Sequence, residues 1–204
     1  MKNPAGRRLA SHRHRAQPAE RRSLASVGQG ADRKKLDMDD QQAVIALSQQ
    51  LKGEVFDLLF VNAGVKGPEV QTPGGATLAE VGQLFFTNAV APINLAQRFV
   101  GQIREDSGVL AFMSSVLGSV TMPDAPELAL YKASKAALNS MTNSFVTQLG
   151  EQKLTVLSLH PGWVKTDMGG EGADIDVQTS TRGLIDQVNA YAGKGGHHFC
   201  ELQG

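Results

Sequence analysis

The chain has 204 residues, 41% hydrophobic and 20% charged, which is enough for one domain with a sizeable core. No apolar run approaches the roughly 20 residues of a membrane helix, and no apolar stretch follows the basic N-terminus, so neither a membrane partner nor a secretory leader is expected. Cys200 is the only cysteine and has no neighbours at metal-ligand spacing. This favours a cytoplasmic location, a structural role for Cys200 and no metal site.

Residues 1–35 differ in charge from the rest of the chain. They hold ten Lys/Arg and two acidic side chains, a net charge of +8, whereas residues 36–204 carry −8. With no aromatic residue and few large aliphatic ones, this segment cannot bury much apolar surface, so we expect it to be basic and poorly ordered. A basic tail can bind nucleic acid, which a steep salt dependence would reveal. Without aromatic interleaving, however, no nucleic-acid partner is expected.

From Leu36 onward, short apolar runs alternate with helical patterns. Helices are predicted over 39–51, 77–104 with a kink at Pro92, 128–149 and 177–192, and strands over 56–61, 109–113, 154–159 and near Phe199 and Cys200. Such alternation is typical of an α/β fold with a parallel sheet and helices on both faces. The three clearest strands run into small or polar segments, where such sheets bind ligands. These segments are Asn62-Ala63-Gly64, Ser114-Ser115 and Pro161-Gly162.

Tyr131 and Lys135 stand four residues apart on a predicted helix, so they share one face of it. A nearby ammonium favours the phenolate, and we expect it to lower the pKa of Tyr131 from about 10 toward neutrality. The phenol could then exchange a proton with a substrate. By itself this spacing is weak evidence, because such a pair is usually part of a solvated helix face.

Two further polar residues occupy unusual positions. Ser115 follows a buried strand, where its hydroxyl could bond a substrate carbonyl or simply satisfy a local turn. Asn88 falls in the middle of a predicted helix, although asparagine is a poor helix former. A buried Asn88 needs hydrogen-bond partners, so we expect it to distort the helix or to hold a water molecule.

Taken together and in chain order, these motifs resemble one family. Asn62-Ala63-Gly64, Asn88, Ser115, the run Tyr131-Lys132-Ala133-Ser134-Lys135 and the run from Pro161 to Thr166 are similar to those of the short-chain dehydrogenases/reductases, over about residues 36–204. The runs 131–139 and 160–168 look closest to the small carbonyl-reductase-like branch that includes the C-signal and sniffer proteins. The resemblance implies a Rossmann-like, doubly wound sheet.

The resemblance also implies an activity: NAD(P)-dependent reduction of a carbonyl, or oxidation of an alcohol, by hydride transfer. Tyr131 would be the general acid or base, and Lys135 would lower its pKa and bind the nicotinamide ribose. Ser115, preferred to Ser114 because Gly118 follows it by three residues, would orient the carbonyl. Asn88 would support Lys135 through a water in a proton relay.

The cofactor implied by the family is NADP, with NAD possible. The resemblance assigns cofactor contacts to residues that follow three predicted strands, to two residues before the first predicted helix and to Tyr131 and Lys135 on a later one. It makes 166–177 a mobile substrate lid. The assigned residues are Asp37, Met38, Asn62, Ala63, Gly64, Tyr131, Lys135, Pro161, Gly162, Val164 and Thr166.

The chain departs from the family at the cofactor phosphates. The glycine-rich turn that cradles the pyrophosphate at a helix N-terminus has no counterpart, since Gly28 and Gly30 give only Gly-x-Gly between segments that are neither strand nor helix. We therefore expect a truncated domain over 36–204, in which the N-terminal strand-helix-strand is missing or degenerate. The alternative function is a non-catalytic relative that binds cofactor poorly and acts in binding or signalling.

Remaining expectations concern substrate and partners. Met122, Trp163 and Met168 could form apolar walls, which suits a small or apolar carbonyl or alcohol. His197 and His198 are adjacent in a strand, so they should face opposite sides and not share a metal ion. The two long helices, 77–104 and 128–149, allow a homodimer or homotetramer by family resemblance.

Overall fold

The computed structural model describes residues 34–122, 125–150 and 153–202. Within these described ranges, four strands form one parallel sheet in the order β1-β2-β3-β4. The strands are β1 (Leu58–Val61), β2 (Val109–Met113), β3 (Thr155–Leu159) and β4 (Gly196–Cys200). The helices are α1 (Gln41–Gln50), α2 (Leu78–Phe85), α3 (Ala91–Phe99), α4 (Ala129–Leu149) and α5 (Val177–Tyr191).

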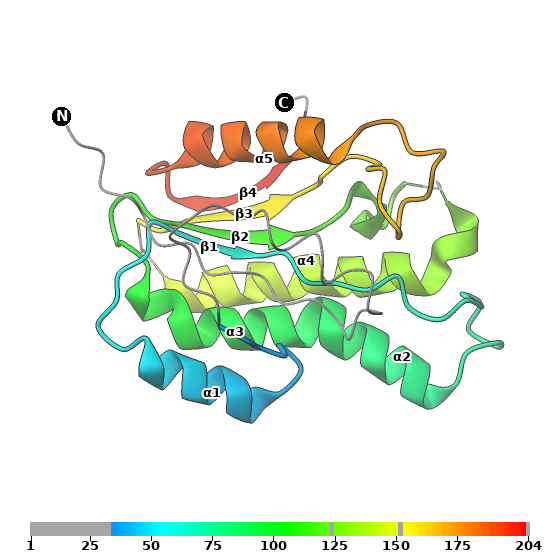
Figure 1. Cartoon of the computed structure of the whole chain (residues 1–204), viewed down its shortest axis with the longest axis horizontal. Coiled ribbons are helices and arrows are strands. Elements are labelled where there is room, and N and C mark those ends of the chain that lie inside the picture. Colours follow the sequence, from blue (N-terminus) through cyan, green and yellow to red (C-terminus); the bar gives the residue numbers. More distant parts are fainter. Residues whose placement is uncertain (1–33, 123–124, 151–152, 203–204) are drawn as a thin grey trace.

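Helices cover both faces of this sheet, as Figure 1 shows: α1 to α4 lie on one side and α5 lies on the other. The central strands β2 and β3 are short apolar runs because helices cover them from both sides, and every residue of β3 is buried. Apolar residues on alternate positions of β2 supply two separate cores, with Leu110 and Phe112 facing α3 and α4, and Val109 and Ala111 facing α5. These observations confirm the predicted α/β class.

Most element boundaries agree with the sequence to within two residues. Helix α4 starts one residue later than predicted, and β2 has the predicted bounds. The first strand is shorter than predicted, because Phe56 forms only an isolated parallel bridge with Ile103 before β1 begins. The predicted N-terminal segment 1–35, including Gly28 and Gly30, lies almost entirely outside the described residues.

The stretch predicted as a single helix over 77–104 is divided into α2, a π-helical segment at Phe86–Val90, α3, and a 3₁₀ turn at Val100–Gln102. The N–H of Ala91 donates to the carbonyl of Phe86, five residues back. Pro92 has no N–H, so the regular helical bond to the carbonyl of Asn88 cannot form. The predicted kink is therefore a π-helical insertion just before Pro92, and it contains Asn88.

Among the described residues, none of the helices combines the length and the apolar character needed to traverse a lipid bilayer. The longest, α4, carries Lys135 and several hydroxyl and amide side chains along its length. Its first turn lies at the same end of the sheet as the carboxyl ends of the strands (Figure 1). Residues at the start of α4 can therefore meet residues that follow the strands.

Candidate active site

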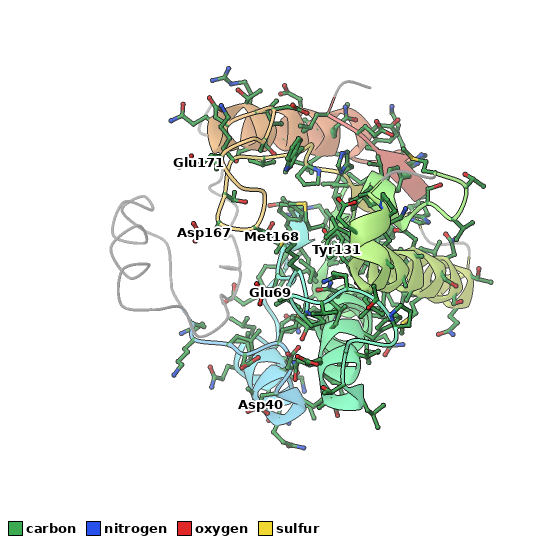
Figure 2. The ribbon with its side chains drawn as sticks, turned by 90° about the vertical axis from the view of Figure 1, so that its right-hand side faces the viewer. Asp40, Glu69, Tyr131, Asp167, Met168 and Glu171 are labelled. Atoms are coloured by element: carbon green, nitrogen blue, oxygen red, sulfur yellow. The ribbon has the colours of Figure 1, made fainter. Side chains whose placement is uncertain are left out.

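The carboxyl edge of the sheet gathers the polar segments singled out in the sequence. The segment Asn62–Gly64 follows β1, Ser114 and Ser115 follow β2, and Pro161 and Gly162 follow β3. Figure 2 looks onto this edge, with Tyr131 of α4 at its centre and Met168 of the 162–176 loop beside it in the view. Because parallel strands all point the same way, side chains from three separate segments meet here.

Ser115 is held at the end of β2 by a short 3₁₀ turn, η4 (Val116–Gly118). Its Oγ accepts a hydrogen bond of 3.1 Å from the N–H of Leu117, and its side chain is also hydrogen-bonded to Tyr131. Gly118 permits this approach, since a Cβ there would lie 2.9 Å from the carbonyl carbon of Lys135. The turn therefore packs directly against the backbone of α4.

Ser114, the alternative considered from the sequence, faces a different neighbour. Its hydroxyl donates to the side-chain oxygen of Asn139 at 2.6 Å, and its exposed fraction is only 2%. Successive residues leaving a strand point to opposite faces, which separates these two serines. The structure thus brings Ser115, rather than Ser114, to the hydroxyl of Tyr131.

Lys135 lies one helical turn beyond Tyr131, as the spacing predicts. Its Nζ lies 5.8 Å from the centre of the Tyr131 ring and donates to the carbonyl of Met113, the last residue of β2, at 2.8 Å. Lys135 is almost fully buried, with an exposed fraction of 3%. A phenol, an ammonium and a hydroxyl from Ser115 therefore converge at one edge of the sheet.

Burial dominates the ionisation of this pair. It raises the pKa of Tyr131 to about 12, although the hydrogen bond with Ser115 opposes the rise, and it lowers the pKa of Lys135 to about 8. The expectation that Lys135 brings the pKa of Tyr131 below its usual value is therefore wrong, because the pKa is raised instead. Desolvation disfavours the charged form of both residues. At neutral pH the phenol is protonated and the lysine is mostly cationic.

Asn88 is fully buried in the π-helical segment, and its amide makes three hydrogen bonds. Its Oδ1 accepts from the N–H of Val65 at 2.8 Å, and its Nδ2 donates to the carbonyl of Val65 at 2.8 Å and to the hydroxyl of Ser134 at 3.0 Å. The distorted helix thus aims Asn88 at the loop that follows β1. Its partners are Val65 and Ser134, with no direct bond to Lys135.

Gly64 sits where these groups come closest. A Cβ at this position would lie 3.3 Å from Oδ1 of Asn88 and 3.4 Å from Nζ of Lys135. A glycine leaves room for the loop to pass close to both side chains. This gives the sequence Asn62-Ala63-Gly64 a local steric reason, and it places the loop backbone against the buried lysine.

Two side chains that the sequence did not single out bond the backbone of Tyr131. Oε1 of Gln71 accepts from its N–H at 2.9 Å, and Oγ of Ser134 donates to its carbonyl at 2.7 Å. Ser134 belongs to a recognised motif, so its position was available from the sequence. Gln71 lies in a Gly/Pro-rich loop 60 residues away, and no local pattern indicates its contact.

The expected adenine-side residues lie just before α1. The carboxylate of Asp37 accepts from the N–H of Asp39 at 3.0 Å and is exposed, so it forms a turn next to the helix. Met38 is buried in the core with an exposed fraction of 4%, which leaves little of it accessible to a ligand. Asp39, which was not expected to have a role, bonds Thr87 and Gln83 and ties this turn to α2 and to the π-helical segment.

The segment after β3 turns sharply at Gly162, whose φ of +75° belongs to the left-handed region. The hydroxyl of Ser180 donates to the carbonyl of Pro161 at 2.7 Å, which anchors this segment to α5. Val164 forms an isolated parallel bridge with Ile175, so the loop between them closes on itself. The base of the expected substrate lid is therefore fixed.

Inside this loop, Thr166 and Trp163 organise the turn. The hydroxyl of Thr166 donates to the carbonyl of Val164 at 3.3 Å and accepts from the N–H of Gly169 at 3.1 Å. The indole N–H of Trp163 donates to the carbonyl of Gly169 at 2.8 Å. Trp163 keeps an exposed fraction of 54% and Met168 one of 44%, so both offer apolar surface.

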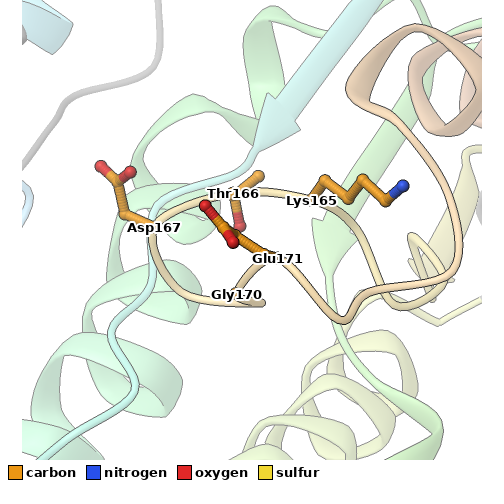
Figure 3. Close-up of a pocket in the computed structure, with 5 residues that line it drawn as sticks. All are labelled: Lys165, Thr166, Asp167, Gly170 and Glu171. Carbon is orange, nitrogen blue, oxygen red and sulfur yellow. The ribbon is translucent and has the colours of Figure 1, made fainter.

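The loop also encloses an open hollow of about 440 Å³, drawn in Figure 3. Its described lining residues all belong to the 162–176 loop and include both signs of charge. They are Lys165, Thr166, Asp167, Gly170 and Glu171. The residues expected as apolar walls, Met122, Trp163 and Met168, are not among them.

His197 and His198 point to opposite sides of β4, as predicted. His197 bonds Ser158 at 2.9 Å and Asn143 of α4 at 2.7 Å, whereas His198 stacks on Tyr191 of α5 with ring centres 4.7 Å apart. Among the described residues, no group of three or more potential metal ligands occurs. Both histidines therefore have structural partners.

Comparison with known proteins identifies the family. A family model described as short chain dehydrogenase matches residues 7–174. The chain belongs to the short-chain dehydrogenases/reductases. The match begins inside the basic segment 1–35, so the likeness to this family reaches further toward the N-terminus than the motifs indicate.

Curated relatives in this short-chain dehydrogenase/reductase family differ in how much of them the chain covers. The C-signal protein of Myxococcus xanthus is 31% identical over 149 residues, which are 72% of this chain and 89% of that protein. A hydroxynaphthalene reductase-like protein of Metarhizium brunneum is 34% identical over 72% of this chain but only 52% of its own length. The chain therefore spans about half the length of some curated relatives that it matches.

Solved structures of short-chain dehydrogenases/reductases share the fold. A carbonyl reductase from Pseudomonas aeruginosa in complex with NADP has a TM-score of 0.80 and 34% identity, over 91% of this chain and 80% of that one. The carbonyl reductase Sniffer of D. melanogaster also has a TM-score of 0.80, with 28% identity over 100% of this chain and 88% of that one. The chain therefore lies closest to the carbonyl-reductase-like branch, as expected from its motifs.

Proposed function

We propose that this protein is an NADP-dependent oxidoreductase that reduces a small apolar carbonyl compound, with Tyr131 as the general acid. The observation that carries the proposal is the convergence of Tyr131, Ser115 and Lys135 at the carboxyl edge of the sheet. A carbonyl reductase solved with bound NADP has the same fold, and about a third of its aligned residues are identical to those of this chain. This supports the choice of cofactor. NAD is the second candidate.

The proposed chemistry needs a proton for the carbonyl oxygen. Bound NADPH would supply the hydride to the carbonyl carbon. Burial keeps Tyr131 protonated at neutral pH, since its pKa is about 12, so its hydroxyl is available to donate that proton. The hydroxyl of Ser115, bonded to Tyr131, would donate to the same oxygen and stabilise its developing charge.

Lys135 would act as the cation of the site. Its ammonium is fixed by the carbonyl of Met113 and lies near the Tyr131 ring, so its positive charge favours negative charge that develops nearby. The same group would bond ribose hydroxyls of the cofactor. Asn88 would act indirectly, because its three bonds hold the Val65 loop and Ser134 in place.

The described residues fit the nicotinamide half of the cofactor. The Gly162 turn is anchored to α5 through Pro161, and Gly64 brings the loop backbone so close to Lys135 and Asn88 that a Cβ there would crowd both side chains. We propose that Asn62, Ala63 and Gly64 contact the ribose next to the adenine, and that Asp37 and the Met38 backbone contact the adenine. Pro161, Gly162, Val164 and Thr166 would contact the nicotinamide end. Gly28 and Gly30, the only sequence candidates for a phosphate turn, lie outside the described residues.

The test uses the full chain with NADPH and a panel of apolar aldehydes, ketones and quinones. Consumption of NADPH would be followed by its near-ultraviolet absorbance, and binding by quenching of Trp163, the only tryptophan. Tyr131→Phe should lower turnover by at least about 100-fold while the fold and NADPH binding persist. Tyr191→Phe is the matched control, because Tyr191 is the only other tyrosine and packs on His198 at the α5 face.

Two results would contradict the proposal. Turnover that survives Tyr131→Phe would remove the proton donor from its role. If NADPH does not quench the fluorescence of Trp163 in the full chain, the alternative is favoured, in which this family member binds no cofactor and acts without catalysis.

A further inference from the structure

Gln71 is a buried polar residue in the loop between β1 and α2. Its exposed fraction is 6%, and its side chain makes three hydrogen bonds. Nε2 donates to the carbonyls of Lys66 at 3.0 Å and Pro68 at 2.8 Å, and Oε1 accepts from the N–H of Tyr131 at 2.9 Å. One amide group therefore joins its own loop to the first turn of α4.

The orientation of this amide is fixed by its partners. Two backbone carbonyls can only accept, so they require the –NH₂ group, and the N–H of Tyr131 can only donate, so it requires the oxygen. Rotating the amide by half a turn would place like groups together and lose all three bonds. The site therefore requires a side chain that both donates and accepts hydrogen bonds, as Gln71 does.

Tyr131 needs an external partner at this point. Helix α4 begins at Ala129, so the N–H of Tyr131 belongs to the first turn, where no carbonyl of the helix can accept it. The residue preceding the helix, Leu128, offers no side-chain cap. Gln71 supplies the missing acceptor from 60 residues away in the sequence.

The carbonyl of Tyr131 is held as well. It accepts from Oγ of Ser134, which in turn accepts from Nδ2 of Asn88. Asn88 also grips both backbone groups of Val65, at the start of the loop that Gln71 closes. The loop 65–71 is thus fixed at both ends by side chains that also fix the peptide groups on each side of Tyr131.

A glycine in the same loop shows how closely it is packed. Gly67 has a φ of +92°, and a Cβ there would lie 2.8 Å from Cδ2 of Leu84 and 3.4 Å from Nε2 of Gln71. Leu84 of α2 is fully buried. The loop therefore has little room to move while the Gln71 bonds remain.

We infer that Gln71 is a positioning residue for Tyr131. It caps the first turn of α4, and it links the loop 65–71 to the backbone of Tyr131, so that it sets where the reactive phenol lies along the helix axis. This inference rests on the proposed role of Tyr131 as proton donor. A misplacement of about 1 Å in a reacting group can cost about 100-fold in rate. A contact of Gln71 that sets the start of α4 therefore acts on turnover without touching the substrate.

Three variants separate the parts of this role. Gln71→Leu removes the acceptor and both donors, whereas Gln71→Glu keeps the acceptor for Tyr131 and loses the donors to the loop. Gln178→Leu makes the same change as the first at an exposed position of α5 and is the matched control. Hydrogen exchange of the peptide covering 129–135, in the protein without added cofactor, reports on the cap directly.

In Gln71→Leu we expect amide exchange at Tyr131 to accelerate about 5- to 10-fold, the effect of one lost hydrogen bond, while β2 and β3 stay protected. Gln71→Glu should restore most of the protection at Tyr131. With NADPH and an accepted carbonyl, kcat of Gln71→Leu should fall about 10- to 100-fold, with KM changed less than about threefold. The control should match the unmodified protein in every measurement.

Unchanged exchange at Tyr131 in Gln71→Leu would overturn the inference. So would faster exchange across the whole domain together with a lower Tm, which a merely structural role predicts. If Gln71→Leu does not fold, loss of Tyr131 protection in Gln71→Glu would overturn the cap in the same way. Because exchange is measured without catalysis, these outcomes are independent of the Tyr131→Phe result, which tests the proposed function itself.

Discussion

The buried lysine of the site should make the stability of this protein depend on pH in a specific way. The change to make is Lys135→Met, which keeps a long unbranched side chain and removes the amine. In the folded protein burial lowers the pKa of Lys135 from 10.5 to about 8. A difference of this size corresponds to about 3 kcal/mol between the charged and neutral forms.

The folded state binds fewer protons than the unfolded state between about pH 8 and 10.5, because the folded pKa of Lys135 is the lower one. The cost of burying the charge is therefore fully present below about pH 8, and stability rises with pH through this window. Lys135→Met lacks this contribution. The unfolding free energy of the unmodified protein minus that of Lys135→Met should rise by about 2.5 kcal/mol between pH 7 and pH 10.

Urea unfolding followed by circular dichroism at several pH values measures this difference. The series stops near pH 10, since the pKa of Tyr131 is raised to about 12 and this group lowers stability as pH rises further. Lys52→Met, at an exposed position after α1, is the control and should show no comparable rise. A difference for Lys135→Met that stays constant from pH 7 to pH 10 would refute the claim that burial governs this lysine.

Three further predictions follow from the same geometry. If the Lys135 ammonium takes part in reduction, kcat/KM should fall as pH rises through about 8, and a flat steady-state profile up to pH 9 would argue against it. Gly162→Ala should lower the free energy of unfolding, measured with denaturant, by about 1–2 kcal/mol, because φ is +75° and the new Cβ would lie 2.7 Å from Cδ1 of Ile175. A variant as stable as the unmodified protein would contradict this. Asn88→Ala should lower the free energy of unfolding by about 2–4 kcal/mol and speed hydrogen exchange at the Val65 amide, since it leaves buried polar groups unpaired. Unchanged exchange at Val65 would argue against the role of Asn88 in holding this loop.

Much of the site follows from local sequence. Tyr131 and Lys135 are one turn apart on any helix, and β1, β2 and β3 end in polar segments whatever the rest of the chain does. Because parallel strands carry these ends to one edge, the motif order was sufficient to predict which segments meet. The choice of Ser115 over Ser114 came instead from the family resemblance, in which a glycine follows the serine by three residues, and the structure gives Gly118 a steric reason.

The ionisation of the site could not be obtained in this way. Spacing shows that an ammonium lies near a phenol, but it does not show how much water surrounds them. Tyr131 and Lys135 are both buried against the end of β2, so desolvation reverses the expected shift of the tyrosine. That burial depends on how α4 packs on the sheet, which is a property of the whole fold.

Sequence alone thus determined the alternation of strands and helices and the chain order of the reactive groups, since both arise from periodicity and neighbours within a few residues. Only the tertiary structure decided that Asn88, in its π-helical turn, bonds Val65, and that Gln71 bonds the backbone of Tyr131. These contacts join residues 23 and 60 positions apart. No local pattern encodes them, because they exist only once separate segments share one buried edge of the sheet.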